Sequence, residues 1–101
     1  MSYCIIWEFS VSKSQRTAFE AAYGPNGPWA LLFRKSEGFL NVELLRSCDR
    51  PDIYFTIDRW ISEQAFRDFR RDHSVEYEAL DRRLDGLASR ETRLDTFTEQ
   101  P

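Results

Sequence analysis

The sequence predicts an α+β fold in which helices cover one face of a four-stranded antiparallel sheet. Residues 53–58 alternate with the period of two that places side chains on opposite faces of a strand. A serine and an apolar stripe with three-to-four-residue spacing follow directly, as at the start of an amphipathic helix. The first half of the chain repeats this succession. The resulting order, strand, helix, strand, strand, helix, strand, is the split βαβ arrangement.

The first half of the chain is expected to hold one strand and two helices. Residues 3–11 alternate as a strand. The helix that follows is capped by Ser12 or Ser14 and ends at Gly24. Pro28 suits the first turn of a second, shorter helix, because its missing amide would have no partner there. The strand face that needs helix cover holds Tyr3, Ile5, Trp7, Phe9 and Val11.

The second half of the chain supplies three more strands and a further helical region. Residues 40–47 and 53–60 are expected to form an antiparallel hairpin, with a turn at 49–51. Helical spacing then runs from Ser62 to about residue 88, and residues 91–99 alternate as the fourth strand. We find no composition shift that marks a linker, so residues 1–101 are expected to form a single domain.

The sheet face without helices is expected to be partly apolar. A large exposed apolar patch is unfavourable for a monomer. Packing two such faces together would bury it, so we expect a two-fold symmetric homodimer through the open sheet face. The residues expected on this face are Cys4, Ile6, Leu45, Tyr54, Trp60 and Phe97, interspersed with Glu8, Asn41, Glu43, Thr56 and Asp58.

Composition narrows the partners and the compartment. Lys and Arg total 14 against 17 Asp and Glu, a net charge of −3, so the broad positive field of a nucleic-acid-binding protein is missing. The first residues carry no basic leader and no long apolar run, so neither secretion nor membrane insertion is expected. Cys4 and Cys48 do not form a close pair. We expect reduced thiols and a cytoplasmic location.

One histidine and several aromatic side chains are the candidates for chemistry. His73 is the only histidine, so any reaction that needs an imidazole near neutral pH must use it. Capping or packing at a helix junction explains the same residue. Trp60 and Tyr77 are candidates for the wall and polar rim of an aromatic pocket beside it. The candidates for substrate binding are Tyr23, Trp29, Phe33 and Phe69, although a filled core accounts for Phe33 and Phe69 as well.

Motifs that bind metals or cofactors are missing. The sequence has no Gly-rich phosphate fingerprint, no paired histidine ligands and no nucleophile elbow. Glu8, Glu43 and Asp58 would suit a hard cation if they converged on one sheet face, but they lie on separate strands and can pair with Arg93 instead. We therefore expect neither a metal nor a cofactor.

The segment from Trp60 to His73 resembles the antibiotic biosynthesis monooxygenase family. The residues that carry the resemblance are Trp60, Ser62, Phe66, Phe69 and His73, and a weaker likeness extends over nearly the whole chain. The resemblance implies a ferredoxin-like domain that pairs into a dimeric α+β barrel. It also implies a monooxygenase that oxidises a small phenol or quinol with molecular oxygen and without metal or flavin. His73, Tyr77 and Trp60 would then act as base, donor and stacking wall.

Two departures from the family pattern keep other functions open. Polyketide-oxidising members carry an Asn where this chain has Thr56, and haem-degrading members carry a first-strand Asn where it has Trp7. The haem reading ranks below the oxygenase reading. A non-catalytic barrel that binds a small apolar or aromatic ligand, and an isomerase or cyclase on the same fold, explain the same residues. Turnover of a ligand separates these classes.

Overall fold

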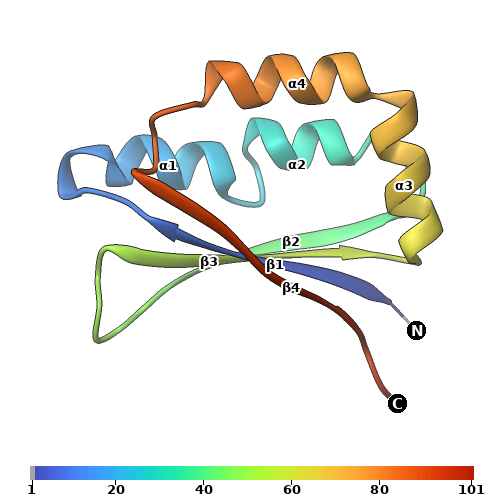
Figure 1. The fold of residues 1–101 in the computed structure, drawn as a ribbon, viewed down its shortest axis with the longest axis horizontal. Coiled ribbons are helices and arrows are strands. Elements are labelled where there is room, and N and C mark those ends of the chain that lie inside the picture. The colour runs from blue at the N-terminus through green and yellow to red at the C-terminus, as the bar shows by residue number, and fades with distance from the viewer. Residues whose placement is uncertain (1) are drawn as a thin grey trace.

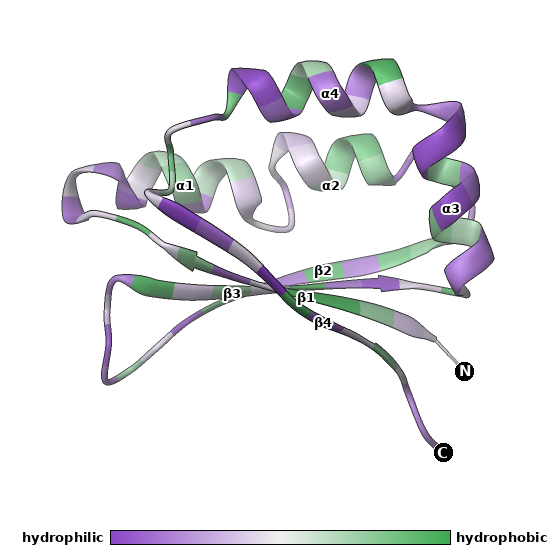
Figure 2. Cartoon of the chain, in the orientation of Figure 1, coloured by the Kyte–Doolittle hydropathy of each residue, from purple (hydrophilic) through white to green (hydrophobic). Residues whose placement is uncertain are grey.

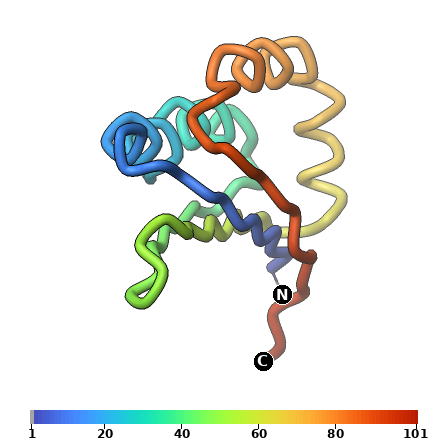
Figure 3. Tube along the Cα trace, turned by 60° about the vertical axis from the view of Figure 1, so that its left-hand side comes forward, coloured from blue at the N-terminus to red at the C-terminus, as the bar shows by residue number. Residues whose placement is uncertain are grey.

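The computed structural model describes residues 2–101, and it has the α+β architecture that the sequence predicts. Four antiparallel strands form one sheet in the order β2-β3-β1-β4, and the helices lie together on one side of it (Figure 1). The turned view in Figure 3 shows the same two layers. The strands are β1 (Tyr3–Ser10), β2 (Phe39–Arg46), β3 (Ile53–Trp60) and β4 (Arg90–Thr98). The helices are α1 (Arg16–Tyr23), α2 (Pro28–Phe33), α3 (Glu63–Asp72) and α4 (Ser74–Arg83), and a short 3₁₀ turn, η1 (Lys13–Gln15), precedes α1.

Most helix ends follow the local sequence. The Ser62 side chain accepts a hydrogen bond of 3.1 Å from the Ala65 amide and so caps α3. Pro28 is the first residue of α2, and Gly24 follows the last residue of α1. The expected serine cap of α1 is wrong, because Ser12 precedes η1, Ser14 lies within it, and the N-cap position of α1 is Gln15, whose side chain makes no capping hydrogen bond.

The helical region after β3 is two helices, with the junction at a position that the sequence analysis left open. His73 lies between them with φ −121° and ψ 27°, outside the helical range. Figure 1 shows α3 standing at one end of the sheet and α4 turning back over α2. This change of direction brings the side chains of α4 above the middle of the sheet.

The face assignment of β3 in the sequence analysis is wrong. Residues directly opposite each other in an antiparallel pair share a face. Trp60 lies opposite Tyr3, and Asp58 lies opposite Ile5, so both belong to the helix-covered face. Tyr54 and Thr56 share this face, and all four of these β3 side chains are buried. The opposite set, Ile53, Phe55 and Ile57, lies on the open face, where the sequence analysis expected Tyr54, Thr56, Asp58 and Trp60.

The open face is more apolar than the sequence indicated. Ile57 pairs with Ile6 on one side, and Phe55 pairs with Leu45 on the other. Phe97 and Leu45 are each 48% exposed, a large fraction for such side chains. Figure 2 shows hydrophobic residues along these strands and hydrophilic ones along most of α3 and the start of β4.

A β-bulge shifts the pairing of β1 with β4 between Ile6 and Trp7. Beyond the bulge Trp7 lies opposite Arg93, and Phe9 lies opposite Glu91. Because facing residues share a side of the sheet, Glu91 points toward the helices. Simple alternation along β4 does not reveal this position.

Aromatic rings dominate the layer between helices and sheet. Trp60 is fully buried, and its ring lies 5.4 Å from Phe33 on α2 and 5.0 Å from Phe69 on α3, measured between ring centroids. Phe66 and Phe39 complete this cluster at 5.4 Å and 5.3 Å from Trp60. No helix in residues 2–101 has the length and apolar character needed to cross a membrane.

Candidate functional site

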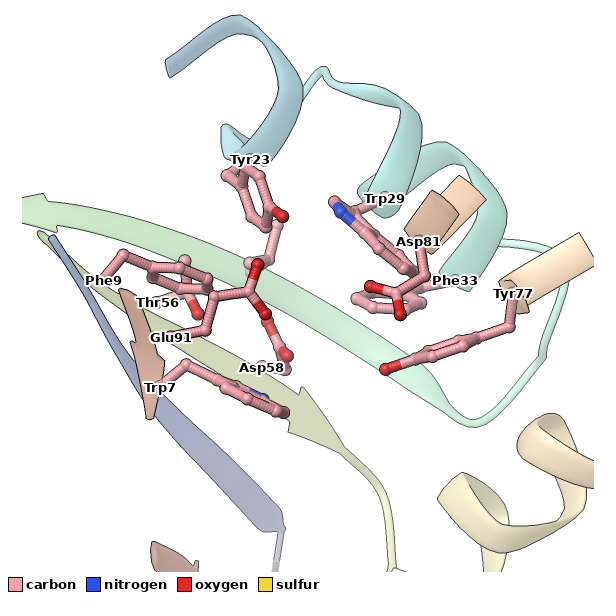
Figure 4. A pocket seen from close by; sticks show the side chains of 11 residues that line it. Trp7, Phe9, Tyr23, Trp29, Phe33, Thr56, Asp58, Tyr77, Asp81 and Glu91 are labelled. Atoms are coloured by element: carbon pink, nitrogen blue, oxygen red, sulfur yellow. The ribbon is translucent and has the colours of Figure 1, made fainter. Parts of the chain in front are cut away.

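A cavity of about 130 Å³ lies between the sheet and the helices, next to the aromatic cluster. Figure 4 shows side chains from both layers pointing into it. Its walls are mainly aromatic, with a few carboxylates and hydroxyl groups among them. This combination is typical of small-molecule sites. The lining residues are Trp7, Phe9, Tyr23, Trp29, Phe33, Val42, Thr56, Asp58, Tyr77, Asp81 and Glu91.

The elements place these side chains by simple periodicity. Trp7 on β1 lies opposite Thr56 on β3, and Asp58 follows two residues later on the same face. On α2, Trp29 and Phe33 are four residues apart and so share one side of the helix. Tyr77 and Asp81 have the same spacing on α4. Residues spaced by four on α2 and α4, and residues spaced by two on β1 and β3, therefore face the same cavity.

Asp58 is the most unusual group in the cavity. Its side chain is only 9% exposed, and within residues 2–101 it makes neither a hydrogen bond nor an ion pair that satisfies normal geometry. A buried carboxylate without a partner is costly in its charged form. Burial raises the pKa of Asp58 from 3.8 to about 7. Close to neutral pH the carboxyl group therefore exists in both protonation states, as a proton-transfer group requires.

Two tyrosines bring hydroxyl groups to the same space. Burial, with the charges of Glu91 and Asp81, raises the pKa of Tyr23. Burial also raises the pKa of Tyr77, and nearby carboxylates add to the effect, whereas the Arg70 guanidinium acts against it. That guanidinium lies 3.7 Å from the centroid of the Tyr77 ring. Both phenols stay protonated at neutral pH and can donate hydrogen bonds.

Two further carboxylates stand nearer to solvent. Asp81 on α4 and Glu91 on β4 both line the cavity, and both residues are largely exposed, unlike Asp58. Partial burial raises the pKa of Glu91, and the charges of Asp81 and Asp85 raise it further. Negative groups are thus gathered at the solvent side of the cavity.

The residues proposed from the sequence divide into two groups. Tyr23, Trp29, Phe33 and Tyr77 line the cavity together. The other three, Trp60, Phe69 and His73, do not line it. Trp60 and Phe69 are buried in the adjacent aromatic cluster.

His73 occupies the helix junction. Its Nδ1 lies 2.8 Å from Glu76 Oε1, and Glu76 also pairs with Lys35. The ring lies 5.3 Å from that of Phe69, centroid to centroid. The side chain is 24% exposed and lines a surface depression between residues 35–38 and α3, which shares no lining residue with the cavity. These contacts match the packing role at a helix junction that the sequence also allowed, although the side chain makes no capping hydrogen bond to α4.

Sequence reasoning missed Trp7, Asp58, Asp81 and Glu91 as candidates for the site. Asp58 shares strand parity with Tyr54 and Trp60, two large rings that suit burial, but the opposite set of Ile53, Phe55 and Ile57 suits burial as well, so the pattern alone does not identify Asp58. The placement also separates Asp58 from Glu8 and Glu43, which lie on the open face. In the part of the chain from residue 2 onward, no three His, Cys, Asp or Glu side chains are arranged to hold a metal ion.

Replacing Asp58 with Asn is expected to change stability in a pH-dependent way. The folded-state pKa of about 7 lies above the unfolded value of 3.8, so the folded state binds this proton more tightly. The wild type should therefore lose stability as pH rises from about 4 to 7. At pH 8 the full penalty, at most about 4 kcal/mol, is present. Asp58→Asn removes this penalty. In urea unfolding, the free energy of unfolding of the variant should therefore rise relative to that of the wild type between pH 4 and pH 8.

Asp49→Asn, in the exposed turn between β2 and β3, is the matched control and should show no such gain. An equal difference between the Asp58 variant and the wild type at both pH values would contradict the raised pKa.

Comparisons with known proteins agree with this fold. The family model described as antibiotic biosynthesis monooxygenase matches residues 2–79. A comparison with curated proteins found no match. The structure is similar to that of a mutant of SnoaB, a cofactor-independent oxygenase from Streptomyces nogalater, at 20% identity and a TM-score of 0.73, covering 99% of this chain and 94% of that one.

Two further solved structures have the same fold. A proposed antibiotic biosynthesis monooxygenase from Bordetella bronchiseptica has 18% identity and a TM-score of 0.75, with coverage of 99% of this chain and 98% of that chain. One from Nitrosomonas europaea has 13% identity and a TM-score of 0.72, with coverage of 97% and 89%. With a family model that spans most of its length, the chain belongs to the antibiotic biosynthesis monooxygenase family.

Proposed function

We propose that this protein is a cofactor-independent monooxygenase that oxidises a small phenol or quinol with molecular oxygen. The observation that supports the proposal is the unpartnered carboxyl group of Asp58 at the floor of a cavity with aromatic walls. Membership of the antibiotic biosynthesis monooxygenase family, and the likeness to a cofactor-independent oxygenase, point the same way.

Asp58 is proposed as the base that removes the phenolic proton. A base works best when its pKa lies near the working pH, and the pKa of Asp58 is about 7. The phenolate that forms needs hydrogen-bond donors. The hydroxyl groups of Tyr23 and Tyr77 remain protonated and line the same cavity. Large rings such as Trp7 and Trp29 would hold the flat substrate between them.

The chemistry then balances without a cofactor. The substrate anion supplies the electrons to oxygen, and a new carbon–oxygen bond forms on the ring. Loss of water leaves a carbonyl group, so one oxygen atom enters the product and the other leaves as water. A phenol becomes a quinone and a quinol becomes a hydroxyquinone, and each loses the four electrons that O₂ gains. Asp58 returns its proton to the departing oxygen.

This proposal assigns the roles of base and wall differently from the sequence alone. His73 lies outside the cavity and pairs with Glu76, so the base is assigned to Asp58. Tyr77 keeps the role of donor. Trp60 and Phe69 would act behind the cavity wall, through their packing on Phe33. Breakdown of haem is not proposed, because His73 does not reach the cavity.

An isomerase or cyclase is the second candidate. A single carboxyl group that gains and loses a proton near neutral pH, inside an apolar cavity, also serves proton transfer on carbon. Such a reaction needs Asp58 but no oxygen. Conversion of a substrate without oxygen uptake would select this candidate, and binding without any conversion would select a ligand-binding barrel.

The activity test is oxygen consumption by purified, metal-free protein with a panel of small phenols and quinols. Asp58→Asn is expected to lower kcat/KM by roughly a hundredfold or more, the range for loss of a general base. His73→Ala should leave kcat/KM within about threefold of the wild type. In the wild type, kcat/KM should rise with pH through about 7, because the base acts in its ionised form. Tyr77 and Asp81 from α4, Tyr23 from α1 and Glu91 from β4 face the same cavity and can shift this midpoint.

Loss of turnover in His73→Ala with full turnover in Asp58→Asn would contradict the assignment of the base. Asp49→Asn, in the exposed turn between β2 and β3, controls for a general effect of removing one carboxylate.

We also propose that two chains pair through the open sheet face. Ile57, Phe55 and Leu45 form an apolar band across neighbouring strands of this face. An apolar band of this kind is unfavourable in contact with water. The cavity lies on the other side of the sheet, so each subunit of the dimer would keep its own.

Phe55→Glu is expected to convert a dimer to a monomer, because the pairing would bury an unpaired charge. Sedimentation at micromolar concentration should show the mass of two chains for the wild type and of one chain for the variant. Leu31→Glu, at a position that is 57% exposed on α2, should leave the dimer intact. A wild-type protein that sediments as one chain overturns this proposal.

A further inference from the structure

The cavity carries negative charge without a compensating cation. Asp58, Asp81 and Glu91 all line it, and among the described residues no Lys, Arg or His does. Arg70 lies over the Tyr77 ring but is not part of the lining. Figure 4 shows the three carboxyl groups directed toward the space between the helices and the sheet.

Several carboxylates elsewhere on the surface are paired with a cation. Glu43 contacts Arg59 at 3.0 Å, Glu63 contacts Arg67 at 2.6 Å, and Asp52 contacts Arg16 at 2.7 Å. None of the three carboxylates of the cavity takes part in an ion pair within residues 2–101.

Asp58 distinguishes this group of carboxylates from a solvated acidic patch, because it is buried. The Asp58 side chain is 9% exposed, lacks a hydrogen-bond partner and faces the cavity. A polar group that is open only to a cavity is satisfied there by ordered water or by a ligand that displaces it. Asp81 and Glu91 lie at the solvent side, so the cavity has one carboxyl group at its floor and two at its mouth.

The size of the cavity limits the ligand to one aromatic ring. Its volume is about 130 Å³. An engineered protein cavity of about 150 Å³ accommodates a benzene molecule. Trp29 and Tyr77 lie 4.9 Å apart between ring centroids and form one aromatic wall. Aromatic faces also attract organic cations.

From these features we propose that the cavity selects a single-ring phenol that carries a protonated amine. The hydroxyl group would meet Asp58 at the floor, and the ammonium group would lie between Asp81 and Glu91 at the mouth. A carboxylate in the same place would meet two like charges and be rejected. The inference rests on the proposed function only for the reaction of the bound phenol with oxygen. Recognition of the amine is independent of turnover.

Three probes with the same phenol ring test the charge preference by calorimetry at low salt. They are tyramine with an ammonium group, 4-ethylphenol with no charge, and 4-hydroxyphenylacetate with a carboxylate. Tyramine is expected to bind at least about tenfold more tightly than 4-hydroxyphenylacetate, with 4-ethylphenol between them. The preference should shrink as salt is raised, because the mouth of the cavity is open to solvent.

A double variant, Asp81→Asn with Glu91→Gln, removes both charges at the mouth while keeping side-chain size. It should bring the ratio of the tyramine and 4-hydroxyphenylacetate dissociation constants close to one and leave 4-ethylphenol binding unchanged. Unchanged binding of the neutral probe shows that the cavity is intact. Glu78→Gln, on α4 but outside the lining, is the matched control and should keep the wild-type ratio.

The inference is overturned if 4-hydroxyphenylacetate binds as tightly as tyramine, if the double variant keeps the wild-type ratio, or if none of the probes binds. Oxygen uptake is read out separately. Selective binding of tyramine without oxygen uptake supports the charge preference and contradicts the oxygenase proposal. Oxygen uptake with neutral phenols and no preference for tyramine supports the oxygenase proposal and contradicts the charge preference.

Discussion

The packing of aromatic rings around Trp60 sets the position of the helices over the sheet. This side chain is fully buried at the end of β3 and contacts Phe33 on α2 and Phe69 on α3. Because the Trp60 ring packs against both α2 and α3, it fixes the positions of these two helices over the sheet. The end of α3, where α4 begins, is fixed with them. The break at His73 then turns α4 back over the sheet, and Tyr77 arrives next to Trp29. The cavity is the space that this arrangement leaves beside the cluster.

The same geometry decides the state of Asp58. Strand parity ties it to Trp60, so the contact that buries the ring also buries the carboxyl group two residues earlier. A carboxylate in that place lowers stability at neutral pH, and a carboxyl group in a cavity whose pKa is strongly raised by burial is a candidate functional group. The hydroxyl groups of Tyr23 and Tyr77 and the carboxylates of Asp81 and Glu91 line the same cavity as the Asp58 carboxyl group. Proton transfer at the floor and charge selection at the mouth use different residues of one cavity.

The order of strands and helices could be predicted from the sequence, because each element has its own period, cap or stop. The Ser62 cap and the first-turn Pro28 are local signals, and both were sufficient. The faces of β3 were not predictable from alternation alone, since Ile53 to Ile57 and Tyr54 to Trp60 are both apolar enough for a core. Pairing with β1 decides between them, and pairing is a tertiary property. The bulge that turns Glu91 inward and the helix break at His73 likewise depend on contacts between distant segments. The aromatic part of the site was therefore recognisable, whereas its acidic part was not.

The protonation of Asp58 is the point on which the account depends most, and carbon-13 NMR of the side-chain carboxyl groups measures it directly. The resonance is assigned by its loss in Asp58→Asn and followed from pH 4 to pH 9 in the folded protein. We predict a midpoint near 7, since the carboxyl group is buried without a partner. A midpoint below 5 would show a solvated or paired carboxylate and would contradict its role as the proton acceptor of the cavity.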